Sequence, residues 1–158
     1  VETYYPIVYT EFFSSTRKFD GRRYGRKIED ACGPEVLRRI LGGSEITKSE
    51  HKGRYYHLAL RVKDFISQEF GKVFKKVDVL VSPTVPQLPY KIGEKLCVEE
   101  IYSYDLLTIP VNLFGGCAIS IPCGKINGVP VGMQIIGNKL EDQKILNVAS
   151  IIEKELKD

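Results

Sequence analysis

The sequence predicts a mixed α/β fold in which helices cover a mixed β-sheet. Short apolar runs rich in β-branched residues predict strands, and longer segments with apolar residues every three to four positions predict helices. The two kinds of segment alternate along 158 residues, and no linker rich in Pro, Gly or Ser separates them. We therefore expect one lobe spanning residues 1–158.

The first third of the chain is predicted to contain one strand and two helices. Residues 4–9 are aromatic or β-branched apart from Pro6, which favours a strand, and residues 10–18 fit a short helix. The charged residues 19–33 are expected to form a loop. Pro34 then opens a helix, because Pro is tolerated in a first turn, and Gly42-Gly43 is expected to end it.

The strongest helical pattern lies in the segment that follows Thr47. Thr47 is a candidate N-cap with Glu50 three residues later, the spacing of a capping box. Apolar residues then recur at helical spacing over about 28 residues. They are Tyr55, Leu58, Val62, Phe65, Ile66, Phe70 and Val73.

The second half is predicted to contain the sheet. Residues 77–81 and 118–122 are short apolar runs that are typical of strands buried on both faces. Asn127-Gly128 predicts a tight hairpin turn to a strand at residues 131–136.

Helices and one loop complete this half. Residues 83–95 hold three prolines and predict an irregular loop. A helix is expected at residues 99–107, ended or kinked by Pro110, and an amphipathic helix at residues 141–156.

Composition excludes several classes of protein. The net charge of +3 is too balanced to indicate nucleic-acid binding by itself. Cys32, Cys97, Cys117 and Cys123 form no CxxC pair, and His51 and His57 are isolated, so zinc-ligand spacing is absent and no metal site is expected. No run of about 18 apolar residues predicts a membrane span.

The chain begins at Val1 and its only methionine is Met133, so we expect a piece of a longer protein.

Polar residues in unusual surroundings are the remaining functional candidates. The sequence has no P-loop, no Rossmann glycine pattern and no G-x-S-x-G nucleophile motif. Asp105 and Arg39 have apolar neighbours, which leaves two interpretations, a structural ion pair or a ligand contact. The basic segment from Arg17 to Lys27 is either a solvated loop or a contact to tRNA phosphate or an acidic partner.

Several segments together resemble the C-terminal region of amidase-signature enzymes, specifically the A subunit of glutamyl/aspartyl-tRNA(Gln/Asn) amidotransferases. These segments follow the family's order nearly end to end. They are residues 19–25, 35–40, 77–84 with Ser-Pro-Thr at its end, 91–95, 105–113, 118–124 and 127–137. The resemblance implies the C-terminal portion of the amidase-signature fold.

The resemblance also implies the activity of the whole protein. The family's catalytic Ser, Ser and Lys lie upstream of the resembling region, so no catalytic residue is expected in this chain and the chain alone is expected to be inactive. Glutamine hydrolysis would supply ammonia to a B subunit, which uses ATP and Mg to convert Glu-tRNA or Asp-tRNA, and a C subunit would complete a cytoplasmic heterotrimeric ligase. No cofactor is implied for this chain.

By position in the resembling segments, Tyr4, Arg39 and Asp105 are the residues expected to hold glutamine. Asp105 would pair with its α-ammonium group, Arg39 with its α-carboxylate, and Tyr4 would add a hydroxyl hydrogen bond. One departure is that the stretch between Gly25 and Gly33 is shorter than in many bacterial relatives, which bears on the register of Arg39.

Two alternatives remain at this point. One is another amidase-signature hydrolase that acts on a simple amide without tRNA. The presence of both Asp105 and Arg39 argues against it, because a neutral amide needs no such charge pair. The other is a non-catalytic module that binds tRNA or a protein through the basic segment.

Overall fold

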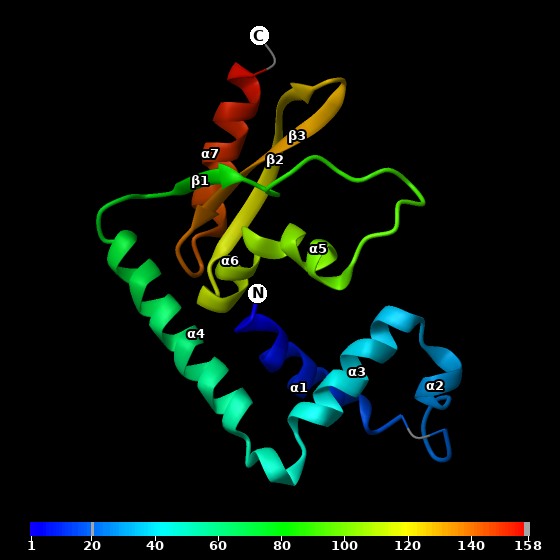
Figure 1. The fold of residues 1–158 in the computed structure, drawn as a ribbon. Helices are drawn as coiled ribbons and strands as arrows, with labels where there is room; N and C mark the ends of the chain where they lie inside the picture. Colours follow the sequence, from blue (N-terminus) through cyan, green and yellow to red (C-terminus); the bar gives the residue numbers. More distant parts are fainter. Residues whose placement is uncertain (20, 157–158) are drawn as a thin grey trace. The chain divides into compact units, whose positions relative to one another are not determined.

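The structure is a computed structural model that describes residues 1–19 and 21–156 (Figure 1). Contacts divide the chain into two compact units. The N-terminal unit is Glu2–Lys63, and the C-terminal unit runs from Asp64 onward and includes Val1. The single lobe expected from the sequence stays a prediction.

The N-terminal unit is helical where the sequence predicted a strand. It contains α1 (Tyr4–Thr16), α2 (Ile28–Ala31), α3 (Pro34–Ile46), the 3-10 turn η1 (Ser49–His51) and the start of α4 (Arg54–Val73). The strand prediction at residues 4–9 was therefore wrong, because packing overrides the preference of aromatic and β-branched residues. The rings of Tyr5 and Tyr9, one helical turn apart, are in contact with centroids 5.4 Å apart.

The second prediction that fails in this unit is the helix end at Gly42-Gly43. Helix α3 continues to Ile46 because the glycines allow α1 and α3 to approach closely. A Cβ atom on Gly43 would lie 2.0 Å from the backbone oxygen of Tyr9 and 2.5 Å from Cβ of Phe13. These glycines serve a helix crossing rather than a helix end.

The predicted capping box at Thr47 is also wrong. Thr47 ends α3, where its backbone N–H and its hydroxyl both donate to the carbonyl of Gly43, at 3.1 and 2.9 Å. Helix α4 begins at Arg54, after a turn in which Lys52 and Gly53 have φ of 46° and 71°. The apolar periodicity predicted α4 correctly but placed its start too early.

The C-terminal unit contains the sheet and confirms the mixed α/β class. After α4, its elements are β1 (Leu80–Pro83), α5 (Val98–Ser103), the 3-10 turn η2 (Tyr104–Leu106), α6 (Ile109–Phe114), β2 (Cys117–Ile126), β3 (Val129–Gly137) and α7 (Asp142–Glu155). The predicted hairpin turn is present, with φ of 52° at Asn127 and 81° at Gly128. Positive φ at both residues is the geometry that Asn-Gly adopts in two-residue hairpins.

The three strands pair in the order β1-β3-β2, and both pairs are antiparallel. Among the described strands, the parallel pairs that a mixed sheet requires do not occur. Strands β1 and β2 form the two edges. A register shift between Pro122 and Gly124 interrupts the pairing of β2 with β3.

The prediction that the strands at residues 77–81 and 118–122 are buried on both faces was wrong. In β1 half-buried and exposed residues alternate, with Val81 54% exposed, and β2 likewise has every second residue exposed over its first half. Helix α7 packs against one face of the sheet, as Figure 1 shows. Its contact forms a core of Ile121, Ile135, Ile145 and Ala149.

The opposite face carries a polar row. Ser82, Gln134 and Ser120 are aligned across β1, β3 and β2, and side chains of aligned residues lie on the same face. Because Gln134 and Ile135 are successive residues, they lie on opposite faces. Among the described residues, no helix is both long and apolar enough to cross a membrane.

Candidate functional site

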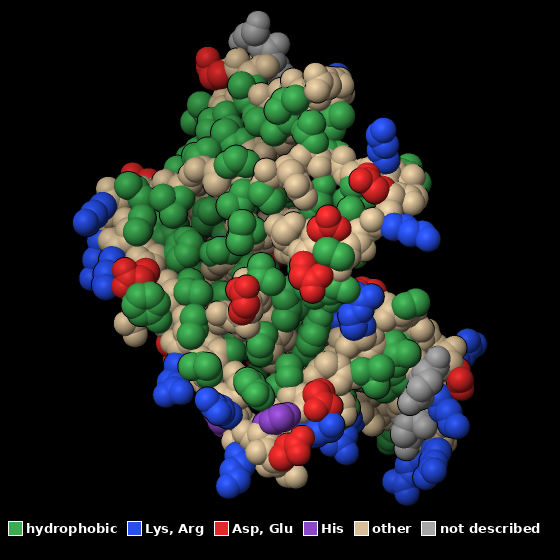
Figure 2. All heavy atoms as spheres, in the orientation of Figure 1, with side chains coloured by type: hydrophobic (Ala, Val, Ile, Leu, Met, Phe, Trp, Pro, Cys, Tyr) green, Lys and Arg blue, Asp and Glu red, His purple; other side chains and the backbone are tan. Residues whose placement is uncertain are grey.

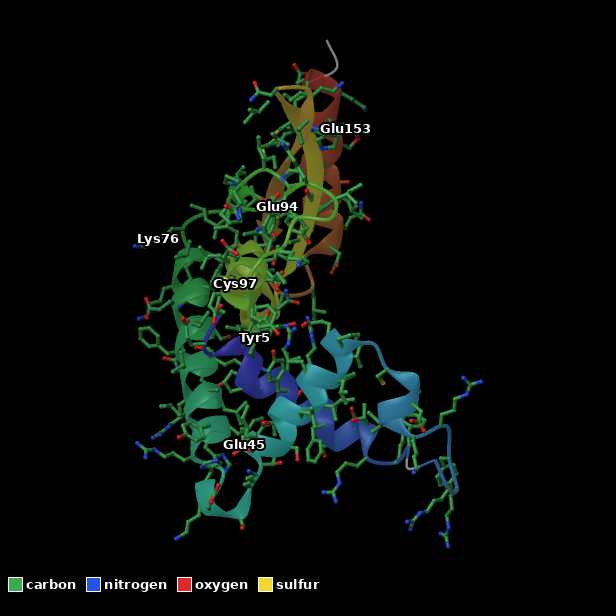
Figure 3. All side chains as sticks on the ribbon, turned by 45° about the vertical axis from the view of Figure 1, so that its right-hand side comes forward. Tyr5, Glu45, Lys76, Glu94, Cys97 and Glu153 are labelled. Carbon is green, nitrogen blue, oxygen red and sulfur yellow. The ribbon has the colours of Figure 1, made fainter. Side chains whose placement is uncertain are left out.

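Tyr4 is the first residue of α1 and lies half-buried against its neighbour Tyr5. Its ring meets that of Tyr5 edge to face, with centroids 5.4 Å apart and an interplanar angle of 81°. Tyr5 is 7% exposed and in turn contacts Tyr9. At the start of α1 the Tyr4 ring therefore packs on the buried Tyr5 ring, and Figure 3 labels Tyr5 there.

Arg39 lies on α3, where two neighbours hold its guanidinium group. Its Nε is 3.1 Å from Oε1 of Glu35, one turn earlier in the helix. Its Cζ lies 6.0 Å from the centre of the Tyr5 ring, within cation–π range. Tyr4 and Arg39 thus both contact Tyr5, and the structure brings these two predicted site residues to the same pair of helices.

The ion pair between Arg39 and Glu35 agrees in part with the interpretation that Arg39 forms a structural ion pair. Pairs of this spacing on a helix are worth only about 0.3–0.5 kcal/mol, and the Arg39 side chain is 34% exposed. A contribution of this size is enough to orient the guanidinium group. The contact is compatible with ligand binding by the same side chain.

Asp105 lies in the short turn η2, between α5 and α6. Its side chain is half-buried, and its carbonyl oxygen accepts hydrogen bonds from the N–H of Leu107 and from the N–H and hydroxyl of Thr108, the last two both 3.2 Å long. The helix predicted at residues 99–107 is thus divided between α5 and η2. Pro110 does not end it, because this proline lies in the first turn of α6.

Gln134 is a polar residue of this region to which sequence reasoning gave no role. It is 4% exposed, and its Nε2 donates to Oγ of Ser82 at 3.2 Å and to the carbonyl of Leu107 at 3.1 Å. The available signal was a side-chain amide inside the otherwise apolar run at residues 131–136.

Asp105 belongs to the C-terminal unit, whereas Tyr4 and Arg39 belong to the N-terminal unit. The structure describes the two units separately. The site formed by all three residues therefore stays a prediction.

A polar cavity of about 350 Å³ lies beside the Asp105 turn. The side chain of Tyr104, the residue before Asp105, lines it and donates a hydrogen bond to the carbonyl of Leu88. The Tyr104 and Tyr90 rings meet at 5.5 Å, and Glu94 and Glu100 add carboxylates to the lining. Figure 3 labels Glu94 and Cys97 on the segment that leads into α5.

A group of three polar side chains, Glu45, Glu50 and His51, lies in the N-terminal unit. The ligand atoms of Glu45, Glu50 and His51 all fall within 4.8 Å of one another. Lys48 forms an ion pair with Glu45 and lowers the pKa of that carboxyl, and Nε2 of His51 lies 3.9 Å from Glu45 and 3.8 Å from Glu50. The pairing of Lys48 with Glu45 and the exposure of both glutamates are typical of a solvated surface group.

The basic side chains of residues 17–27 are all exposed, and Figure 2 shows Lys and Arg side chains gathered around this loop near α2. Arg17 and Lys18 lie over the rings of Phe13 and Phe19, at 5.5 and 5.1 Å. A binding role for this segment stays a prediction.

Comparison with known proteins decides the family. The family model described as Amidase matches residues 1–146. The chain belongs to the amidase family. The amidase fold is seen in solved structures as well: a crystal structure of an amidase covers 98% of this chain with a TM-score of 0.80 at 24% identity, which shows likeness of fold.

Several relatives of the amidase family carry the description A subunit of glutamyl-tRNA(Gln) amidotransferase. The chain is 54% identical over 154 residues to the protein of this description from Methanocaldococcus jannaschii, and 50% identical over 153 residues to that from Methanobrevibacter smithii. A crystal structure of the corresponding protein from Thermotoga maritima matches 94% of the chain with a TM-score of 0.65 at 33% identity.

This amidase-family chain spans about a third of the length of these relatives. The match to the M. jannaschii protein covers 98% of the chain but 36% of that relative, and the match to the T. maritima protein covers 33% of its chain. What the full-length relatives do is therefore carried to this chain only as a proposal.

Proposed function

We propose that this chain is part of the glutaminase subunit of a tRNA-dependent amidotransferase and supplies part of the glutamine pocket. The observation that carries the proposal is the 54% identity, over 98% of the chain, to a relative described as the A subunit of glutamyl-tRNA(Gln) amidotransferase. The contacts of Arg39 with Glu35 and Tyr5, and the hydrogen-bonded turn of Asp105, support a pre-organised role for both charged side chains.

The pocket chemistry follows from the charges of free glutamine. Its α-ammonium and α-carboxylate groups both lose water when the pocket closes, so each needs an opposite charge. The Asp105 carboxylate accepts hydrogen bonds from the ammonium, and the planar fork of Arg39 donates to the carboxylate. Tyr4 adds a hydroxyl donor. With both ends fixed, the side-chain amide is directed toward the nucleophile.

The reaction itself takes place on residues outside this chain. A serine of the parent protein, with a lysine as general base, attacks the side-chain amide of glutamine and forms a glutamyl ester, and ammonia leaves. Water then hydrolyses the ester to glutamate. The ammonia reaches a B subunit that uses ATP and Mg to activate Glu-tRNA or Asp-tRNA, and a C subunit completes a cytoplasmic heterotrimer.

The test is Asp105→Ala in the full-length, assembled protein. We expect the KM for glutamine to rise about 100-fold, because a charge-assisted hydrogen bond to a buried ion is worth on the order of 2–3 kcal/mol. The matched substrate is glutaramate, which is glutamine without the α-amino group. Ammonia release from glutaramate should change little.

An unchanged KM for glutamine in Asp105→Ala would remove Asp105 from the pocket. Product formation without partner subunits or ATP would favour the simple-amide hydrolase instead. Steeply salt-dependent tRNA binding by the isolated chain would favour the binding module.

A further inference from the structure

The most deeply buried polar side chain outside the proposed pocket is Gln134. Among the residues that the structure describes, it is the one polar or charged side chain that is buried, with 4% of it exposed. An amide at this depth destabilises the fold unless its polar atoms form hydrogen bonds. The hydrogen bonds of Gln134 therefore show which segments it holds together.

These hydrogen bonds join three segments of the C-terminal unit. Gln134 lies on the central strand β3, directly across from Ser82 on β1. Its Nε2 donates to Oγ of Ser82 at 3.2 Å and to the carbonyl of Leu107 at 3.1 Å. Because a carbonyl oxygen only accepts hydrogen bonds, the second contact fixes which end of the amide is the NH₂ group.

The carbonyl of Leu107 belongs to the turn that carries Asp105. The N–H of Leu107 donates to the carbonyl of Asp105, so the two residues form a single closed turn. On its other side the turn leads into α6, whose Ile109 and Phe114 are each 3% exposed. The turn is therefore held by apolar packing through α6 and by a polar contact with the sheet, made by Gln134.

We propose that Gln134 is a positioning residue that sets the place of the Asp105 carboxylate for the α-ammonium group of an amino-acid substrate. The inference rests on the proposed function, since it gives Gln134 an effect only through Asp105. Loss of the contact with Leu107 lets the turn move relative to the sheet. The carboxylate then no longer meets the ammonium group at hydrogen-bond distance.

The test variant is Gln134→Met in the full-length, assembled protein. Methionine keeps the length and nearly the volume of glutamine but cannot donate to the Leu107 carbonyl. We expect kcat/KM for glutamine to fall about five- to tenfold through KM, with kcat little changed. Glutaramate, which has no α-ammonium group, should be hydrolysed as by the wild type.

The matched control is Ser82→Ala. It removes the other hydrogen-bond partner of Gln134 and leaves the contact with Leu107 in place, so kinetics with both substrates should stay at the wild-type level. In a double variant with Asp105→Ala, the Gln134→Met change should have no further effect on glutamine, because its influence passes through Asp105.

The outcomes separate this inference from the proposed function. If Asp105→Ala raises the KM for glutamine and Gln134→Met does not, Gln134 has no positioning role while the pocket stands. If Asp105→Ala has no effect, the pocket itself fails. Equal losses with glutamine and glutaramate in Gln134→Met would make the residue a general structural support and overturn the inference.

A second variant keeps the inference testable if Gln134→Met does not fold. Gln134→Glu has the same shape, and its protonated form regains an O–H donor for the Leu107 carbonyl. The KM defect for glutamine relative to wild type should therefore shrink as pH falls. A defect that does not depend on pH would contradict the inference.

Discussion

At the scale of single residues, Glu35 shows how one side chain can organise two arginines. Its two carboxylate oxygens bind Nη1 of Arg38 at 2.7 Å and Nε of Arg39 at 3.1 Å. Arg38 is exposed, whereas Arg39 is directed to the Tyr5 ring on α1. The sequence indicated Arg39 through its apolar neighbours, and the four-residue spacing of Glu35 and Arg39 in a predicted helix was the available sign of their pairing.

Tyr56 provides a pH-dependent test at the residue scale. Its hydroxyl donates to Oε1 of Glu11 at 3.1 Å, and burial, followed by the contact with Glu11, raises the pKa of Tyr56 above its usual value. An interaction that raises the pKa of a group in the folded state stabilises the protein in full at pH values below the unfolded-state pKa, which is about 10 for tyrosine. This stabilisation is lost as the pH rises through the folded-state pKa.

We therefore expect Tyr56→Phe to lower the free energy of unfolding by about 0.5–1 kcal/mol at pH 7, a value reduced for partial exposure. The difference from wild type should shrink above about pH 10. Urea unfolding at pH 7 and at about pH 11 measures it, with the exposed neighbour Tyr55→Phe as control. A difference that stays constant between these pH values would contradict the assignment.

At the scale of elements, the chemistry of turns was easier to predict than the limits of helices. The Asn127-Gly128 hairpin was predicted because two residues with positive φ are enough to define it. The Gly42-Gly43 pair is a local signal too, but glycine is needed there because the backbone of α1, more than thirty positions earlier in the chain, lies against it. A signal with a distant cause cannot be separated from a helix end by sequence alone.

The helix crossing can be tested with a matched pair of glycines. Gly43→Ala places a methyl group 2.0 Å from the Tyr9 carbonyl oxygen, so α1 and α3 must separate, and we expect a loss of roughly 3 kcal/mol in the free energy of unfolding. At Gly71 in α4 a Cβ meets nothing within 4 Å. Gly71→Ala should raise stability by about 0.5–1 kcal/mol.

Denaturant unfolding of both variants measures these changes. Similar values for the two substitutions would show that α1 and α3 do not approach as closely as the structure shows. A large loss confined to Gly43→Ala would locate the tight contact at the Tyr9 backbone.

At the scale of the whole molecule, family and fold class were within reach of the sequence and the geometry of the site was not. Motifs from residue 19 to residue 137 indicated the amidase-signature family, which the match over residues 1–146 confirms. The hydrogen bond between Gln134 and Leu107 spans 27 positions and depends on the path of the chain between them. No local pattern encodes a contact of that kind.

The proposed location of the catalytic residues predicts the behaviour of the isolated chain. If the family's catalytic serines and lysine lie outside it, the purified 158-residue chain releases no ammonia from glutamine, and adding glutamine in excess does not change this. A coupled ammonia assay checks the prediction, with the full-length protein as the positive control. Ammonia release by the pure chain would contradict it.

The interruption of β2 between Pro122 and Gly124 has a consequence for how copies of the chain meet. A ten-residue outer strand with its amide and carbonyl groups in one unbroken line is a template for stacking into fibres. Proline contributes no N–H, and the shifted register bends the line at its middle. What remains is two short stretches with a bend between them, which makes this strand a poor template for pairing with a second molecule.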